Sequence, residues 1–259
     1  MNNLDKNWDN LFGEYTTDET VWCGQWVTYS PDQKVTKSQR VIRSFRSNAD
    51  NTVITHINRY INASGNIEEK TWQIDRETCN QPDGVVHPAR SWMRALAIGA
   101  NATAWTSQQL IPGTPFGAQL SFKEGNWGTS AAIMYGENGQ LHQILYVREH
   151  LGRFSDEALS LETLKISGNW MGKKRSMTPD LSISPEEDMQ LSFEQMGDRY
   201  KKISLPSNLI LVLSERVNAD QPIQIAVGQQ TANHELKYLE AHYTTAGAFA
   251  LLVSATLQS

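Results

Sequence analysis

The sequence has little of what disulfide-stapled, membrane-spanning or nucleic-acid-binding proteins require. It holds only two cysteines, Cys23 and Cys79, in 259 residues. No uncharged apolar run approaches the ~18 residues of a membrane span. The 23 Lys and Arg are outnumbered by 28 Asp and Glu, and a net charge of -5 disfavours contact with a phosphate backbone. We therefore expect no nucleic-acid partner and no membrane insertion.

The N-terminal residues lack the basic head and apolar core of a secretory signal. We therefore expect a cytoplasmic protein whose two thiols stay reduced. The chain is long enough for one large domain or two smaller ones. With 39% hydrophobic and 20% charged residues, it can bury a sizeable core while keeping a polar surface.

Signatures of common enzymes and metal sites are also missing. There is no Cys-x-x-Cys, no Walker loop, no dinucleotide fingerprint and no Gly-x-Ser-x-Gly elbow. Tyr238 stands where a zincin helix beginning at His234 needs its second histidine. We expect no metal and no cofactor. The remaining candidates for acid–base chemistry are scattered and more typical of structural side chains: His56, His87 and His142, with Asp75 or Glu77.

Helical periodicity is confined to the N-terminus. Trp8, Leu11 and Phe12 share one face of a short helix predicted over residues 7–13. After it, short alternating segments recur between turn residues, which is typical of a β-sandwich or a β-barrel. A closed barrel leaves no exposed sheet edge, so we favour an all-β fold built on an antiparallel barrel.

Two units are predicted, over residues 1–150 and 151–259, with a linker over residues 151–160. Residues 77–90 are expected to form a loop, and residues 234–242 fit a strand about as well as a helix. The basis for two units is an internal echo of three motifs: Gly24-Gln-Trp26 with Gly168-Asn-Trp170, Pro31-Asp32 with Pro179-Asp180, and Tyr60…Gly65 with Tyr243…Gly247.

Gly24, Trp26 and Arg148 are predicted to form a structural barrel end. Glycine suits a first strand where neighbouring chains crowd. A tryptophan ring two residues later can cap the closed end, with its indole N–H on a buried acceptor. Arg148, in the outgoing strand of the first unit, is expected to lie over that ring.

The Gly24-Gln-Trp26 motif resembles the opening of the calycin group, which includes the lipocalins. A wider set of motifs is similar to an uncharacterised lipocalin-like family, a domain of unknown function met mostly in photosynthetic bacteria: Trp8…Leu11, Trp22-Cys-Gly24-Gln-Trp26, Leu205-Pro206, Glu215-Arg216, Pro222 to Gly228 and His242-Tyr243-x3-Gly247. The resemblance implies a lipocalin-like barrel with a second, related barrel-like unit. It assigns no activity, because calycins variously carry apolar ligands, hold a bilin during its attachment to a protein, or guide cyclisations.

Tryptophan is concentrated in the first half, where seven of the eight lie between Trp8 and Trp127. Such rings supply stacking surface for a flat or apolar molecule. Two arginines share a strand face with one of these rings and suit a carboxylate. The predicted ligand-binding residues are therefore Trp72, Trp92, Trp105, Trp127, Arg90 and Arg94.

Three functions fit this sequence. The leading hypothesis is binding of an apolar or conjugated small molecule (bilin, isoprenoid or polyketide-like) in the first barrel. The second is a lyase, isomerase or cyclase acting by confinement, since positioning alone can remove ~7–11 kcal/mol of an activation barrier. The third is a protein-interaction module without a ligand. Catalysis and oligomeric state stay open at this point.

Overall fold

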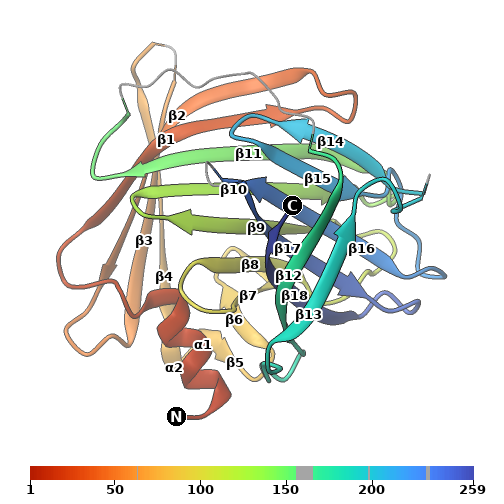
Figure 1. Ribbon diagram of the computed structural model, residues 1–259. Helices are drawn as coiled ribbons and strands as arrows, with labels where there is room; N and C mark the ends of the chain where they lie inside the picture. The colour runs from red at the N-terminus through yellow and green to blue at the C-terminus, as the bar shows by residue number, and fades with distance from the viewer. Residues whose placement is uncertain (63, 156–165, 198, 232–233) are drawn as a thin grey trace.

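The protein is described here by a computed structural model, which covers residues 1–62, 64–155, 166–197, 199–231 and 234–259. Within these ranges the fold is all-β except for helices α1 (Asn3–Phe12) and α2 (Arg76–Cys79). Two antiparallel sheets make up the rest (Figure 1). The expected fold class, an antiparallel barrel followed by a second β-unit, is confirmed.

The first sheet has eleven strands in the order β4-β3-β2-β1-β11-β10-β9-β8-β7-β6-β5. It curves into a nearly closed barrel, and α2 connects its two edge strands directly (Figure 1). Its strands are β1 (Thr20–Tyr29), β2 (Val35–Ser47), β3 (Val53–Ile61), β4 (Ile67–Asp75), β5 (Asn80–Gln81), β6 (Gly84–His87), β7 (Arg90–Ala97), β8 (Ala102–Ser107), β9 (Phe116–Glu124), β10 (Trp127–Tyr135) and β11 (Leu141–Leu151).

The second sheet has seven strands in the order β13-β12-β18-β17-β16-β15-β14. As in the first sheet, the first strand along the chain pairs with the last. Its strands are β12 (Asn169–Met177), β13 (Glu187–Ser192), β14 (Lys201–Leu205), β15 (Leu209–Leu213), β16 (Ile223–Gln230), β17 (Glu235–Tyr243) and β18 (Phe249–Gln258).

Helix α1 lies where the N-terminal periodicity predicted it. The Asn2 side chain caps its first turn by accepting from the Asp5 N–H, and Gly13 follows its last residue. Trp8 and Phe12 are buried in one cluster with inward-facing side chains of the barrel. The Trp8 indole N–H donates to the Asn51 carbonyl at 3.1 Å. The helix therefore contributes apolar side chains to the barrel's own core.

The two faces of the first sheet have different neighbours because side chains alternate along each strand. On β1, Trp22 joins the cluster that contains α1, whereas Val27 belongs to a second cluster shared with the second sheet. The rings of Phe116 on β9 and Tyr243 on β17 meet edge to face at 4.7 Å. The outer face of the barrel thus packs on the second sheet, and its inner face surrounds α1.

The internal echo is present, but its register differs from the expected one. Gly168-Asn-Trp170 does not match Gly24-Gln-Trp26. A single constant spacing instead relates three pairs of residues: Trp22 with Trp170, Gly24 with Gly172, and Pro31 with Pro179. Each glycine lies against the last strand of its own sheet. A Cβ would stand 2.0 Å from the Arg148 carbonyl oxygen at Gly24, and 2.2 Å from the Thr256 carbonyl oxygen at Gly172.

The hairpin turns that follow these strands are alike in backbone geometry. The Ser30 N–H donates to the Lys34 carbonyl at 2.9 Å, and the Thr178 N–H donates to the Ser182 carbonyl at 3.0 Å. In both turns a non-glycine residue adopts a left-handed conformation with φ of 63°. One supersecondary unit therefore opens each sheet.

Several local expectations can be compared with the structure directly. Residues 77–90 are not one loop, because β5 and β6 pair there after the short helix α2. Residues 234–242 fall largely on strand β17. Strand β11 runs to Leu151, and most of the linker predicted over residues 151–160 lies outside the described residues. Cys23 and Cys79 are both free and buried. Within the described ranges, no helix has the length and apolarity to cross a membrane.

Candidate functional site

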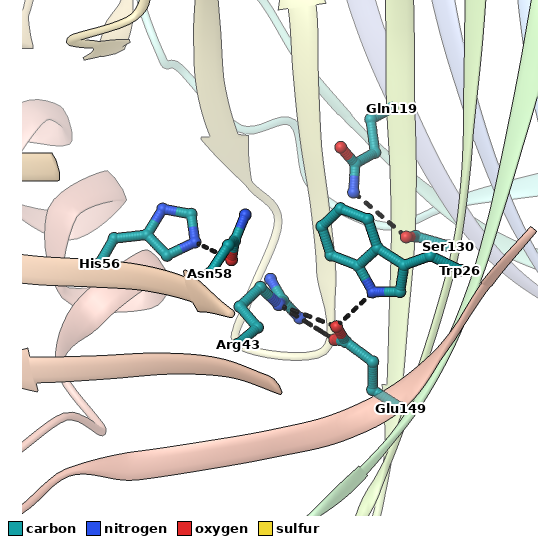
Figure 2. Close-up of polar contacts among 7 residues, drawn as sticks. All are labelled: Trp26, Arg43, His56, Asn58, Gln119, Ser130 and Glu149. Atoms are coloured by element: carbon teal, nitrogen blue, oxygen red, sulfur yellow. Dashed lines mark hydrogen bonds and ion pairs between the residues drawn. The ribbon is translucent and has the colours of Figure 1, made fainter. Parts of the chain in front are cut away.

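A buried carboxylate lies at the centre of the barrel's inner face. Glu149 on β11 is 1% exposed and accepts from the Arg43 Nε at 3.0 and 3.2 Å, with Arg43 Nη2 forming a further contact (Figure 2). The Trp26 indole N–H donates to the same carboxylate at 2.8 Å. Burial opposes the charge on Arg43, but the Glu149 carboxylate outweighs it and raises the Arg43 pKa. The pair is thus neutral overall and links β1, β2 and β11.

The Gly-x-Trp motif follows from this arrangement. A Cβ at Gly24 would lie 2.7 Å from both Cα and Cγ of Glu149. Glycine therefore leaves the space that the carboxylate side chain occupies, and Trp26 supplies its N–H from the same face of β1. The sequence analysis predicted the glycine and a buried acceptor for the indole, but it did not identify Glu149 as that acceptor.

Arg148 does not lie over Trp26. Along β11, Arg148 pairs with Gln25 and Val147 pairs with Trp26, so Arg148 and Trp26 are on opposite faces of the sheet. The Arg148 guanidinium lies over the Trp127 ring at 4.0 Å, and His150 meets that ring edge to face at 4.8 Å. Arg148 and Glu149 are neighbours on β11, so their side chains lie on opposite faces of the sheet. Glu149 is the one that reaches Trp26.

A continuous arc of rings covers another part of the inner face. The Phe45 ring on β2 stacks on His56 on β3 at 4.5 Å, and the His56 ring lies 5.1 Å from Trp72 on β4. The His87 ring on β6 then contacts Trp72 at 5.3 Å and Trp105 on β8 at 5.2 Å. Because β4 and β6 belong to opposite ends of the sheet, the rings meet across the seam where the barrel is not closed by strand pairing.

These inward-facing rings keep partial contact with solvent. Trp26, His56, Trp72, His87 and Trp105 are all intermediate in exposure, although each belongs to the concave side of the sheet. A filled barrel would bury such rings almost completely. The surfaces of these rings are therefore only partly covered. We call Trp26 and the four partly exposed rings of the arc the ring arc site.

Polar side chains line the same face. The Asn58 amide connects two ring-bearing residues of β3, since its Oδ1 lies 3.0 Å from His56 Nε2 and its Nδ2 donates to the Tyr60 hydroxyl at 3.1 Å. Gln119 Nε2 donates to Ser130 Oγ at 3.2 Å on the opposite wall (Figure 2). These groups are neutral hydrogen-bonding groups rather than charges.

Both histidines of the ring arc site are neutral at physiological pH. Burial, followed by the Arg43 charge and His87, lowers the His56 pKa to about 3. Burial, followed by the Arg90 charge, lowers the His87 pKa to about 4. Since Arg43 is matched by Glu149, the inner face carries no uncompensated charge from these groups.

The six predicted ligand-binding residues do not come together. Trp72 and Trp105 belong to the ring arc site, with His87 between them. On β7, Met93 and Ala95 pair with inward-facing partners, so Trp92 and Arg94 lie on the opposite face. The remaining placements are these: Arg94 binds Asp83 at 2.8 Å, Arg90 is exposed, and Trp127 lies beneath Arg148.

The inner face of the second sheet is packed with apolar side chains. Trp170 is 2% exposed and Tyr238 is 1% exposed, in one cluster with Phe193 and Leu257. One buried carboxylate occurs there: Glu240 accepts from Gln224 and lies 3.1 Å from His242 Nε2. Within the described part of the chain, no group of three or more His, Cys, Asp or Glu is placed to hold a metal ion.

Comparison with known proteins gives one family match. The N-terminal profile of the DUF3598 family, a domain of unknown function, matches residues 4–154. No curated protein matches. The crystal structure of a DUF3598 protein of unknown function from Nostoc punctiforme is 14% identical, covers 97% of this chain and 98% of its own, and has a TM-score of 0.72. That similarity shows a shared fold over nearly the full length.

A porin mutant from Rh. blastica also matches in outline. It is 10% identical to this chain, the match covers 93% of this chain and 99% of the porin, and the TM-score is 0.20. A TM-score this low supports no argument about either fold or function.

Proposed function

We propose, for a chain that belongs to the DUF3598 family, that the inner face of the first barrel binds a neutral, apolar or conjugated small molecule. The observation that carries this proposal is the contrast in exposure between two inner faces. The rings of the ring arc site keep solvent contact, whereas Trp170 and Tyr238 in the second unit are fully packed. Rings that are organised but accessible favour a ligand that completes their burial.

The chemistry of the lining favours a neutral molecule. The guanidinium of Arg43 is matched by Glu149, and both histidines are uncharged at pH 7. A ligand with carboxylates, such as a bilin, would need a cation such as Arg90, which is exposed and whose charge lowers the His87 pKa. An isoprenoid or polyketide-like molecule needs apolar surface and a few hydrogen bonds, which Trp72, Trp105 and Asn58 supply. The lipocalin-like resemblance supports the same role, and the free thiols of Cys23 and Cys79 support a cytoplasmic location.

The experiment is native mass spectrometry, with an absorption scan, on the full chain purified from its native host. We expect a co-purifying small molecule in the wild type and its loss from the Trp72→Ala/Trp105→Ala variant. The matched control is Trp92→Ala, which removes a ring from the opposite face of the sheet and should keep the molecule. Conversion of the captured molecule by the purified protein would favour the enzyme hypothesis.

Two results would oppose this proposal. Loss of the molecule in Arg90→Ala or Trp92→Ala, but not in the double variant, would move the site to the face that the sequence analysis predicted. A wild-type protein with no bound molecule, and no gain in thermal stability from added apolar compounds, would favour a protein-interaction module. Thermal stabilisation is a sensitive readout because a ligand that binds only the folded state raises stability by mass action.

A further inference from the structure

The two histidines of the ring arc site lie on opposite sides of the barrel seam. His56 is on β3, next to the edge strand β4, and His87 is on β6, next to the edge strand β5. Their ring centroids are 6.1 Å apart and their planes are nearly perpendicular, at 88°. Trp72 contacts both rings, at 5.1 and 5.3 Å. The two imidazoles are therefore neighbours that share Trp72 as a common contact.

The tautomer of His87 is fixed by the backbone. The Ala89 N–H donates to His87 Nδ1 at 3.0 Å. A backbone N–H can only donate, so Nδ1 is the unprotonated nitrogen. In the neutral imidazole the proton is then on Nε2, and His87 presents an N–H donor at the far side of its ring.

The tautomer of His56 follows from the orientation of the Asn58 amide. The Asn58 Nδ2 donates to the Tyr60 hydroxyl, which leaves Oδ1 facing His56 Nε2 at 3.0 Å. An amide oxygen can only accept, so the His56 proton is on Nε2. The Nδ1 of His56 is then a bare acceptor. Among the described residues, neither this Nδ1 nor His87 Nε2 has a hydrogen-bond partner.

We propose that His56 and His87 act as an acceptor–donor pair that binds a hydroxyl group of the ligand, as found in an alcohol, enol or phenol. This inference rests on the proposed function and adds the group that the inner face recognises. A hydroxyl donates one hydrogen bond and accepts others, so it satisfies His56 Nδ1 and His87 Nε2 together. Two hydrogen bonds of about 2.8 Å each are compatible with rings 6.1 Å apart.

The neutral state of both rings is what makes the pair selective. A protonated His56 would offer only donors, and the pair would then favour an anion or a carbonyl. With one acceptor and one donor, a hydroxyl binds better than a methyl group of the same size, because the methyl group leaves both nitrogens without partners once water is excluded. The ring contacts with Trp72 and Trp105 contribute equally to both kinds of ligand.

The first test needs no ligand. Long-range nitrogen–proton NMR correlation on the ¹⁵N-labelled full chain distinguishes protonated from bare imidazole nitrogens. We expect both His56 and His87 to carry the proton on Nε2 at pH 7. A proton on Nδ1 of His56, which an inverted Asn58 amide would produce, would make His56 Nδ1 and His87 Nε2 both donors and would overturn the inference.

The second test uses two probes, 2-naphthol and 2-methylnaphthalene, in equilibrium dialysis against the full chain. We expect 2-naphthol to bind at least tenfold more tightly than 2-methylnaphthalene. His56→Phe and His87→Phe should each reduce that preference, measured as the ratio of the two dissociation constants, to less than threefold. His142→Phe, which changes an exposed histidine of β11, should keep the wild-type preference.

The outcomes separate this inference from the proposed function. Equal affinity of the wild type for the two probes would overturn the hydroxyl site and leave apolar binding in place. Absence of binding by both probes would contradict both proposals. An unchanged preference in His56→Phe and His87→Phe, with circular dichroism confirming that both variants fold, would assign the selectivity to another group and overturn the inference.

Discussion

The two units of this protein begin with the same structural element and end with different interiors. Each opens with a buried tryptophan, a glycine against the last strand of its sheet, and a turn with one left-handed residue. Behind that opening, the second sheet buries Trp170 and Tyr238 in a dry cluster. The first sheet instead holds a buried ion pair, neutral polar groups and half-exposed rings.

The difference shows that two sheets with the same opening element can have different interiors. What distinguishes the first unit is its number of strands and its lining. The first sheet has eleven strands against seven in the second, and helix α1 packs against its inner side chains. The inner face that remains carries side chains arranged by hydrogen bonds, such as Asn58 and Glu149, rather than by close packing.

The strongest test of this difference replaces one inner tryptophan with alanine in each unit and compares the losses of stability. Trp170→Ala should lower the free energy of unfolding by about 3–5 kcal/mol, because a fully buried ring leaves a large cavity. Trp72→Ala should lower it by only about 1 kcal/mol, because that ring is only partly buried. Urea unfolding measures both. Equal losses would mean that the first inner face is an ordinary packed core.

The two buried carboxylates provide the next comparison. Glu149→Ala should destabilise the protein by about 3 kcal/mol, because it leaves the Arg43 guanidinium without its counter-charge inside the barrel. Glu240→Ala should lower stability by about 1–2 kcal/mol, because its partners Gln224 and His242 carry no fixed charge. Chemical denaturation checks the order, and a larger effect at Glu240 would contradict it.

Substitution of Gly24 and Gly172 tests whether the first strands of the two sheets are structurally equivalent. Gly24→Ala and Gly172→Ala should each destabilise the protein by about 2–3 kcal/mol, because the added methyl group meets a carbonyl oxygen of the neighbouring strand. Gly128→Ala is the control, since its nearest neighbour would be 3.5 Å away, and should change stability by less than about 0.5 kcal/mol. A neutral result at Gly172 would break the correspondence between the units.

The pH dependence of stability tests the two histidines of the first inner face. The folded-state pKa values of His56 and His87, about 3 and about 4, lie below the ordinary histidine value of 6.5. Below that value the unfolded chain binds protons that the folded protein does not. Their contribution to stability is therefore complete above pH 6.5 and is lost as the pH falls towards 4, by up to about 1.4 kcal/mol per pH unit for each histidine.

The measurement is the urea-unfolding free energy at pH 7, 6, 5 and 4. The His56→Phe/His87→Phe variant should show a shallower loss than the wild type, whereas His142→Phe should follow the wild-type curve. Identical pH dependence in all three proteins would mean that the two imidazoles are not desolvated in the folded state.

The sequence predicted those helices and strands that depend on the spacing of apolar residues within a short segment. Trp8, Leu11 and Phe12 specified α1, and the alternating segments specified strands, because both depend on spacing within a few residues. Residues 77–90 were predicted as a loop because Pro82 and Pro88 read as turn signals, whereas β5 and β6 are short strands that depend on pairing with β7.

The site was less predictable because alternation does not say which face is the inner one. Trp92 and Arg94 share the outer face, whereas Arg90 pairs with His87 beyond a register irregularity between Val86 and His87. Arg43 and Glu149 meet because β2 and β11 both pair with β1, and His56 and His87 meet across the seam. No local sequence signal marks such pairs, although Gly24 did indicate where a neighbouring side chain needs space.

The seam between β4 and β5 is also the part of the barrel wall that we expect to open most easily. Elsewhere the barrel wall is held by ladders of backbone hydrogen bonds, but here it is held by contacts among His56, Trp72, His87 and Trp105 and by the short helix α2. Parting these rings breaks no ladder, so this section of the wall opens at a lower free energy than the β1–β11 junction. For the ligand of the proposed function we therefore expect entry at the seam, past rings that also line the inner face.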